Sequence, residues 1–340
     1  MLSLTYKIAE IIAGPLGNRR IYCLPAEKLA AWLTSAQGRQ RTTPPAFVHR
    51  KHELREEILG GRPCYIISPK GKTARTAEER AVLFLHGGGY VEEANAVHWQ
   101  AASQIVNDLG LSLWFPIYPL LTAPGKNGEP APAGTTYKVE DIVESVLSVY
   151  EKMLARYPAG NITVIGDSAG AALSLTLCHH IKARRKELSP DQSTTEPVIP
   201  RSGDALSGLP GKLVLVSPAM LTERDGAILA EMKRLEKGDA LIGMPFMDAM
   251  ITLFNMDLSR DNYYNAPLYG DFKGFPETHV FSGTAEIFYP QIVPFVERMK
   301  QAGVRVAFYA GEKMMHVWPY IPAAPECRAA LKQIVGIIGA

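Results

Sequence analysis

The chain has 340 residues, of which 47% are hydrophobic and 21% charged, and its formal net charge is +2. These values are ordinary for a soluble globular protein, and they exclude a disordered chain and a strongly basic protein built to bind nucleic acid. A chain of this length predicts one large α/β domain that carries an added lid, or two domains.

The N-terminal segment predicts an amphipathic helix. Its apolar residues recur at helical spacing, so we expect them to form one buried stripe. They are Leu4, Ile8, Ile11 and Ile12. The segment differs from a secretory signal, because it lacks a basic start and because Lys7 and Glu10 interrupt the apolar region. No stretch approaches the ~18 apolar residues of a membrane span, so we expect no stable membrane insertion.

The four cysteines are scattered along the chain without paired spacing. They are Cys23, Cys64, Cys178 and Cys327. This pattern predicts neither a disulfide framework nor a zinc site, and we expect no metal. A reducing compartment, the cytoplasm, is therefore the expected location.

From residue 81 onward, short β-rich runs alternate with longer helical ones, which is typical of a parallel sheet covered by helices on both faces. The runs are nearly continuously apolar, as expected for strands buried on both faces. The predicted strands are 81–86, 111–116, 161–166, 212–217, 278–283 and 304–309. The predicted helices are 95–109, 138–157, 168–185, 290–302 and 325–338. Upstream, "ELREEILG" and "RPCYIIS" predict an antiparallel pair at one edge.

Three regions interrupt the alternation. Residues 1–48 are helical, residues 186–211 are rich in Ser, Pro and Gly, and residues 218–270 replace a simple crossover helix with helical pieces rich in Met and Phe. We therefore expect a core made of residues 49–217 and 271–340, a surface excursion at 186–211, and a helical cap made of 1–48 and 218–270.

The stretch "NITVIGDSAGAALSL" at residues 161–175 contains a Gly-x-Ser-x-Gly motif centred on Ser168. Ser168 is a candidate nucleophile on a strand-to-helix turn, but serine is also a preferred residue at the start of a helix. At average residue usage the motif occurs by chance about 0.1 times in a chain this long. The motif alone therefore leaves both interpretations open.

A second motif, "LFLHGGGY" at residues 83–90, places three glycines after a predicted strand. Without side chains, such a loop can come close to a ligand and direct its N–H groups at a developing negative oxygen. An oxyanion hole needs donors from a second loop as well as from the residue after the nucleophile. The glycine loop is therefore a candidate partner of Ser168.

"HGGGY" at 86–90, followed some 80 residues later by "GDSAG" at 166–170, resembles the hormone-sensitive lipase family of α/β-hydrolase esterases, the bacterial family IV carboxylesterases. The resemblance covers the chain from about residue 50 and implies an α/β-hydrolase fold with a helical cap. It implies that Ser168 is the nucleophile and that Gly88, Gly89 and Ala169 supply the oxyanion N–H groups. It implies no cofactor. The supporting motif residues are His86, Gly87, Gly166, Asp167 and Gly170.

Physical chemistry agrees with these roles. Gly166 and Gly170 relieve crowding at the strained turn, and the start of the following helix adds a positive dipole end near the developing charge. For Asp167 we expect a local hydrogen bond that holds the turn, with contact to substrate as the alternative. His86 is expected to shape and anchor its loop rather than act as a base.

Among the eight histidines, His316 is the candidate general base, because it follows the last predicted strand by several residues. The others precede the sheet core, lie within a helix or a strand, or belong to the glycine loop. Packing beside Met and Trp residues is the alternative role of His316. Glu286, three residues past Gly283, is the candidate acid that orients it, although the family more often has aspartate there. Asp261 and Glu277 are weaker candidates, because neither follows a strand at the required place.

The sequence also departs from the family pattern. Ala171 replaces a common glycine, and "YPLLTAPGKNGEPAPAG", from Tyr118, lacks the usual arginine and glutamate. The triad is unaffected, but the loop at 119–135 is expected near the active site. Substrates of better-known members therefore do not transfer directly.

Taken together, the sequence predicts a serine carboxylesterase that hydrolyses short- to medium-chain acyl esters through an acyl-enzyme. The alternatives are a receptor-like ligand-binding homologue, or an amidase, peptidase or acyltransferase with the same triad. The expected partner is a small-molecule ester and not a nucleic acid, and a homodimer is possible in principle. Apolar cap residues are expected to cover the pocket or simply to pack the lid. They include Trp32, Met244, Phe246, Met247, Met250 and Phe254.

Overall fold

A computed structural model describes residues 2–13, 19–37, 41–71, 79–121, 137–188, 208–222 and 224–340. Its centre is an eight-stranded sheet with the order β1-β2-β4-β3-β5-β6-β7-β8. The strands β1 and β2 are antiparallel to each other, β2 is antiparallel to β4, and all other neighbours are parallel. The predicted mostly parallel sheet with an antiparallel edge pair is therefore confirmed.

The strand bounds agree with the apolar runs to within two residues. They are β1 (His52–Leu59), β2 (Arg62–Pro69), β3 (Ala81–Leu85), β4 (Ser112–Pro116), β5 (Ile162–Asp167), β6 (Lys212–Val216), β7 (Glu277–Gly283) and β8 (Val306–Gly311). Every residue of β3 and β5 is buried, as the continuous apolar runs require. The prediction was wrong for β8, whose residues are half-buried or exposed, because β8 is the last strand of the sheet and has a neighbour on one side only.

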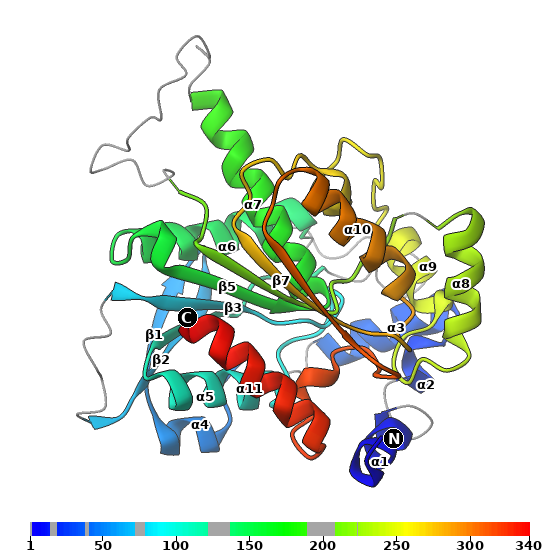
Figure 1. The fold of residues 1–340 in the computed structure, drawn as a ribbon, viewed down its shortest axis with the longest axis horizontal. Helices are drawn as coiled ribbons and strands as arrows, with labels where there is room; N and C mark the ends of the chain where they lie inside the picture. The colour runs from blue at the N-terminus through cyan, green and yellow to red at the C-terminus, as the bar shows by residue number, and fades with distance from the viewer. Residues whose placement is uncertain are drawn as a thin grey trace.

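Helices cover both faces of the sheet (Figure 1). One face carries α6 (Val139–Leu154), α7 (Ala169–Leu188) and α10 (Tyr289–Gln301), and the other carries α4 (Ala46–Lys51), α5 (Ala96–Leu109) and α11 (Pro325–Gly339). Local signals set the ends of α5, where the Asn95 side chain accepts the Val97 N–H at 3.0 Å and Gly110 closes the helix in the left-handed conformation.

The helices α2 (Arg19–Tyr22), α3 (Ala26–Gln37), α8 (Gly226–Glu236) and α9 (Met244–Leu253) lie together, at the right of Figure 1. The Arg19 guanidinium ties α2 to the later segment, because it donates to the carbonyl oxygens of Glu236 at 2.6 Å and Ile242 at 3.3 Å. Segments about 220 residues apart in sequence thus form one layer beyond an end of the sheet.

The N-terminal helix α1 (Leu4–Ala13) forms as predicted, but the predicted burial of its apolar stripe was wrong. Leu4, Ile8, Ile11 and Ile12 are 73%, 46%, 55% and 59% exposed, respectively. The helix is instead held by its opposite side, where Tyr6 is fully buried. An amphipathic pattern identifies the two faces of a helix, but it does not identify the neighbour available to cover the apolar one.

Two sequence predictions fall largely on undescribed residues, namely 189–207 within the predicted surface excursion and 122–136 within the loop that departs from the family pattern. Among the described residues, none of the helices is both long and apolar enough to cross a membrane.

The carboxyl ends of the central strands meet the start of α7 closely at Gly170. A side-chain Cβ at this position would collide with the carbonyl oxygens of Leu85 and His86, which end β3 and begin the glycine loop. The absence of a side chain at Gly170 therefore allows α7 to start directly beside that loop.

Replacing Gly170 by alanine is expected to lower the free energy of unfolding by about 1–3 kcal/mol. The added Cβ would collide with backbone oxygens, which cannot move aside by changing rotamer. Gly336→Ala is the matched control. Gly336 lies in α11 with no atom within 4 Å of an added Cβ, so alanine there is expected to stabilise the protein by about 0.5–1 kcal/mol. Chemical denaturation of both variants measures the difference, and equal stability of the two would contradict the packing described here.

Candidate active site

Ser168 lies on a sharp turn between β5 and α7. Its φ of 51° is in the left-handed region, which is strained for a residue with a side chain. The turn is held by backbone hydrogen bonds from the Ser168 N–H to the Val216 oxygen at 2.9 Å and from the Ala219 N–H to the Ser168 oxygen at 3.1 Å. The adjoining strand β6 thus maintains the strained backbone that presents the Ser168 hydroxyl.

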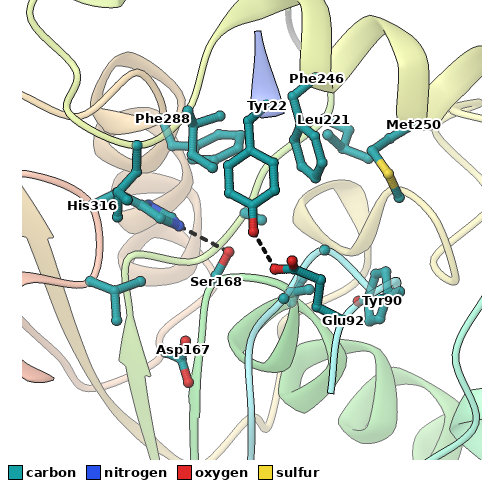
Figure 2. Close-up of a pocket in the computed structure, with 18 of the residues that line it drawn as sticks. Tyr22, Tyr90, Glu92, Asp167, Ser168, Leu221, Phe246, Met250, Phe288 and His316 are labelled. Atoms are coloured by element: carbon teal, nitrogen blue, oxygen red, sulfur yellow. Dashed lines mark hydrogen bonds between the residues drawn. The ribbon is translucent and has the colours of Figure 1, made fainter. Parts of the chain in front are cut away.

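The structure brings Ser168, His316 and Glu286 together in one hydrogen-bonded chain. The Ser168 Oγ lies 2.9 Å from His316 Nε2, and His316 Nδ1 lies 2.7 Å from Glu286 Oε2 (Figure 2 shows the first contact). With Nδ1 donating to the carboxylate, Nε2 is left to accept the serine proton. The three residues come from three separate segments, which follow β5, β7 and β8.

The Glu286 carboxyl is fully buried and held on both sides. Its Oε1 accepts hydrogen bonds from the Ser282 hydroxyl and, at 3.2 Å, from the Gly283 N–H, while Oε2 faces His316. Because buried carboxylates are costly unless hydrogen-bonded, these partners fix the position of Glu286. The longer side chain of glutamate thereby reaches the imidazole from its place after β7.

Burial by itself lowers the pKa of His316, but neighbouring carboxylates reverse the effect. The hydrogen bond and charge of Glu286, with the charges of Asp239 and Asp167, raise the pKa of His316 above its ordinary value. The imidazolium form, which a general base must pass through, is therefore stabilised in this site.

Asp239 is a buried carboxylate that the sequence-based prediction missed. It accepts N–H groups of Leu241 at 2.7 Å, Ile242 at 2.9 Å and Ile287 at 2.7 Å, the last being the residue after Glu286. Burial raises the pKa of Asp239. The stretch "KGDAL" contains no motif that indicates a buried aspartate, because the partners of Asp239 are backbone N–H groups.

The glycine loop lies against the serine turn through Asp167. The Gly87 N–H donates to Asp167 Oδ1 at 3.1 Å, and His98 Nε2 donates to Oδ2 at 3.2 Å. Asp167 therefore joins the serine turn to the glycine loop and to α5. The sequence predicted only a local hydrogen bond within the turn.

His86 is fully buried in the same loop and does not line the cavity that contains Ser168. Its Nδ1 donates to the Gly87 oxygen at 2.7 Å, and its ring stacks on Tyr118 at 4.2 Å between centroids. Burial lowers the pKa of His86 to about 3, so the ring stays neutral.

Gly88, Gly89 and Ala169 lie beside Ser168 at the wall of one cavity. The N–H groups of all three have no hydrogen-bond partner among the described residues. Gly88 has a φ of 115°, a conformation that only glycine adopts readily. The residues predicted to be oxyanion donors thus present unused N–H groups near the serine.

The cavity has a volume of about 270 Å³ and also contains His316. Its walls are mostly apolar, with Leu221, Phe246, Met250 and Phe288 around the serine (Figure 2). Of the six apolar residues predicted for the cap, only Phe246 and Met250 line this cavity among the residues that the structure describes.

The competing candidates lie elsewhere. Asp261 is exposed, and Glu277 pairs with His279 at 3.1 Å and with Arg305. His179 and His180 are buried within α7, and His52 Nε2 lies 2.7 Å from the Ser103 hydroxyl. None of these residues lines the cavity that contains Ser168.

Comparison with known proteins agrees with this geometry. Residues 82–320 match the family model described as alpha/beta hydrolase fold, which is well over half of the chain. The chain belongs to the alpha/beta hydrolase fold family. Its central sheet and strand-to-helix serine turn are the features expected of such a hydrolase.

Relatives of this alpha/beta hydrolase include an acetyl-hydrolase from Streptomyces hygroscopicus, 25% identical over 255 residues, covering 74% of this chain and 73% of the relative. An esterase from Acinetobacter venetianus is 25% identical over 284 residues, and the alignment covers 80% of this chain and 80% of that esterase. Among solved structures, an esterase from the bacterial hormone-sensitive lipase family has a TM-score of 0.70 and 21% identity, over 100% of this chain and 98% of that one. This last likeness shows a shared fold.

The hydrolase positions its His316 loop with a residue from the far N-terminus. The Met315 N–H donates to the buried hydroxyl of Tyr6 at 2.5 Å, so α1 is attached to the residue next to His316. Nothing in the sequence pattern of α1 points to this contact, which spans 309 residues.

Tyr6→Phe is expected to lower both kcat and stability, because the Met315 N–H loses its acceptor in a buried place, at a cost of about 1–3 kcal/mol. Tyr150→Phe is the matched control, since the Tyr150 hydroxyl donates to the Gly208 oxygen at 2.9 Å, away from the cavity. Steady-state kinetics and chemical denaturation separate the two variants. The control should lose stability without losing kcat, and an unchanged kcat in Tyr6→Phe would contradict a positioning role.

Ala171, where the family commonly has glycine, is fully buried in the first turn of α7. Among the described residues, no group of three or more His, Cys, Asp or Glu side chains is arranged to hold a metal ion.

Proposed function

We propose that this protein is a serine carboxylesterase that hydrolyses short- to medium-chain acyl esters through an acyl-enzyme. The observation that carries the proposal is the hydrogen-bonded chain from Ser168 through His316 to Glu286, which opens into an apolar cavity. The names of the relatives, an acetyl-hydrolase and an esterase, support the same reaction class.

In the first half of the proposed reaction, Ser168 Oγ attacks the ester carbonyl carbon and His316 Nε2 accepts the serine proton. The imidazolium is stabilised by Glu286. Collapse of the tetrahedral intermediate breaks the bond to the alcohol oxygen, which receives the proton from His316. An acyl group then remains on Ser168.

In the second half, a water molecule attacks the acyl carbon while His316 accepts its proton. The second tetrahedral intermediate releases the carboxylic acid, and the proton returns to Ser168. In both halves the negative oxygen is proposed to lie against the N–H groups of Gly88, Gly89 and Ala169. Their unused hydrogen-bonding capacity supports this role.

The size of the cavity supports the preference for small substrates. A volume of about 270 Å³ is just below the range of roughly 300–1,000 Å³ that is typical of small-molecule sites. As part of the proposal, residues 1–48 and 218–270 form a cap over a core of 49–217 and 271–340, and the Arg19 hydrogen bonds between the two cap segments support this division. A cytoplasmic location, expected from the unpaired cysteines, also belongs to the proposal.

A panel of p-nitrophenyl esters with acyl chains from acetyl to palmitoyl tests this function, and an anilide of the preferred acid tests the amidase alternative. The expected result is hydrolysis that peaks between acetyl and octanoyl esters, with slower cleavage of the anilide. Failure to hydrolyse any ester would overturn the esterase assignment. A maximum at palmitate would overturn the preference for small substrates.

A further inference from the structure

Glu92 is a carboxyl residue in the cavity that the proposed reaction does not use. Its N–H donates to the Gly88 oxygen at 3.0 Å, and a Cβ on Gly88 would lie 2.7 Å from the Glu92 oxygen. The backbone of Glu92 is thus packed directly against the glycine loop. Its side chain lines the same cavity as Ser168 and His316 (Figure 2).

The Glu92 carboxyl is held by Tyr22, which belongs to α2. The Tyr22 hydroxyl donates to Glu92 Oε2 (Figure 2). The Tyr22 ring packs on Phe246 with 4.6 Å between ring centroids, which fixes the direction of the hydroxyl. The second oxygen, Glu92 Oε1, has no hydrogen-bond partner among the described residues, and it is therefore available to a bound molecule.

Apolar side chains line one part of the cavity beside this pair. Leu221, Phe246 and Met250 line the cavity around it. Burial raises the pKa of Glu92, although the hydrogen bond from Tyr22 and the charge of His98 oppose the shift. Glu92 is half-buried, and its Oε1 is not among the fully buried atoms that lack a partner, so this oxygen opens to the cavity. A substrate in the cavity that supplies a donor can therefore reach it.

We propose that Glu92, oriented by Tyr22, is a specificity-determining residue that accepts a hydrogen bond from a hydroxyl group on the ester substrate. The substrate class is then an ester whose acyl or alcohol part carries a hydroxyl a few bonds from the carbonyl. The proposal rests on the proposed esterase function. The apolar side chains of Leu221, Phe246 and Met250 favour a neutral hydroxyl over an ammonium group as the donor, because an ammonium group would lose its hydration beside them.

A purely structural role is the competing explanation. The Tyr22–Glu92 hydrogen bond also fastens α2 to the glycine loop, so its loss could lower activity on every ester alike. Recognition of a hydroxyl predicts a different result, since only substrates with that hydroxyl lose the contact. The ratio of kcat/KM between matched esters therefore separates the two roles.

Two ester pairs provide the measurement. In one, pentyl butyrate is compared with its analogue in which a hydroxyl replaces the terminal methyl of the pentyl group. In the other, butyl heptanoate is compared with the analogue in which a hydroxyl replaces the terminal methyl of the heptanoyl chain. Release of acid is followed by pH-stat titration for the wild type, Glu92→Leu, Glu92→Gln, Tyr22→Phe and Glu93→Gln. Glu93 is the matched control, because it lines the same cavity as Glu92 but its carboxyl pairs with Arg62 at 3.4 Å.

The wild type is expected to prefer the hydroxylated ester of at least one pair, and Glu92→Leu is expected to reduce that ratio about tenfold. Glu92→Gln keeps a hydrogen-bond acceptor, so it should reduce the ratio less than Glu92→Leu, and so should Tyr22→Phe. If Glu92→Leu does not fold, these two variants test the proposed recognition of the hydroxyl. Glu93→Gln should keep the wild-type ratio. Equal ratios in the wild type and the Glu92 variants, or an equal loss in Glu93→Gln, would overturn the proposal. Failure of the esterase function looks different, because neither member of a pair would then be hydrolysed by the wild type.

Discussion

Replacing Ser168 by alanine is expected to reduce kcat/KM for ester hydrolysis by about 10⁵-fold or more, because no other side chain in the chain of hydrogen bonds can form the acyl-enzyme. The Ser168 hydroxyl is the hydrogen-bond partner of His316 Nε2, at 2.9 Å, and its removal would leave the proposed base without a nucleophile. The measurement is the initial rate on the preferred p-nitrophenyl ester over a range of enzyme concentrations.

Ser148→Ala is the control for this substitution. The Ser148 hydroxyl donates to the Ser145 oxygen at 2.7 Å within α6, so the same chemical change is made away from the cavity. The control should retain wild-type kinetics. If Ser168→Ala retained more than about a tenth of the wild-type activity, water attack without an acyl-enzyme would have to replace the mechanism given above.

Glu286→Gln is expected to reduce kcat by about 10³–10⁴-fold and to change its pH dependence. An amide can donate to His316 Nδ1 and so favour the tautomer whose Nε2 carries a proton and cannot accept one from Ser168. The fold should persist, because glutamine has nearly the same shape and can still accept the Gly283 N–H. Kinetics from acid to alkaline pH, with circular dichroism as the check on folding, measure both effects.

The direction of the pH shift follows from the charges around His316. In the wild type, activity should rise with pH as the imidazolium loses its proton, with a midpoint above the ordinary histidine value of about 6.5. Burial lowers the pKa of His316, and the negative charge of Glu286 opposes this effect. Without that charge the pKa of His316 should fall, so the midpoint should move to lower pH. A midpoint that stays in place in Glu286→Gln would contradict the assignment of Glu286 as the partner of His316.

The sheet and the hydrogen-bonded site could be predicted from sequence because each has a local pattern. Apolar runs identify strands buried on both faces, as in β3 and β5. Ser168 and the glycine loop have distinctive neighbours, and their place at the ends of strands brings them together. His316 and Glu286 follow from chain order in such a fold, which places them after β8 and β7.

What the sequence could not predict depends on contacts between distant segments. The exposed side of α1 and the Tyr6 hydrogen bond to Met315 depend on which surface α1 meets, and helical periodicity carries no such information. Asp239 is bonded to backbone groups, which have no residue pattern. The Tyr22–Glu92 contact joins α2 to the segment directly after the glycine loop across 70 residues, and no local pattern in the sequence indicates it.

Covalent labelling by diethyl p-nitrophenyl phosphate tests the proposed acyl-enzyme chemistry most directly. This organophosphate reacts with a nucleophile that has a general base and leaves a stable phosphoryl group in place of the transient acyl group. We predict one phosphoryl group per chain, located on Ser168 by peptide mass spectrometry, release of one equivalent of p-nitrophenolate, and little labelling of His316→Ala. A label on another residue, or an enzyme that hydrolyses esters while remaining unlabelled, would contradict the account.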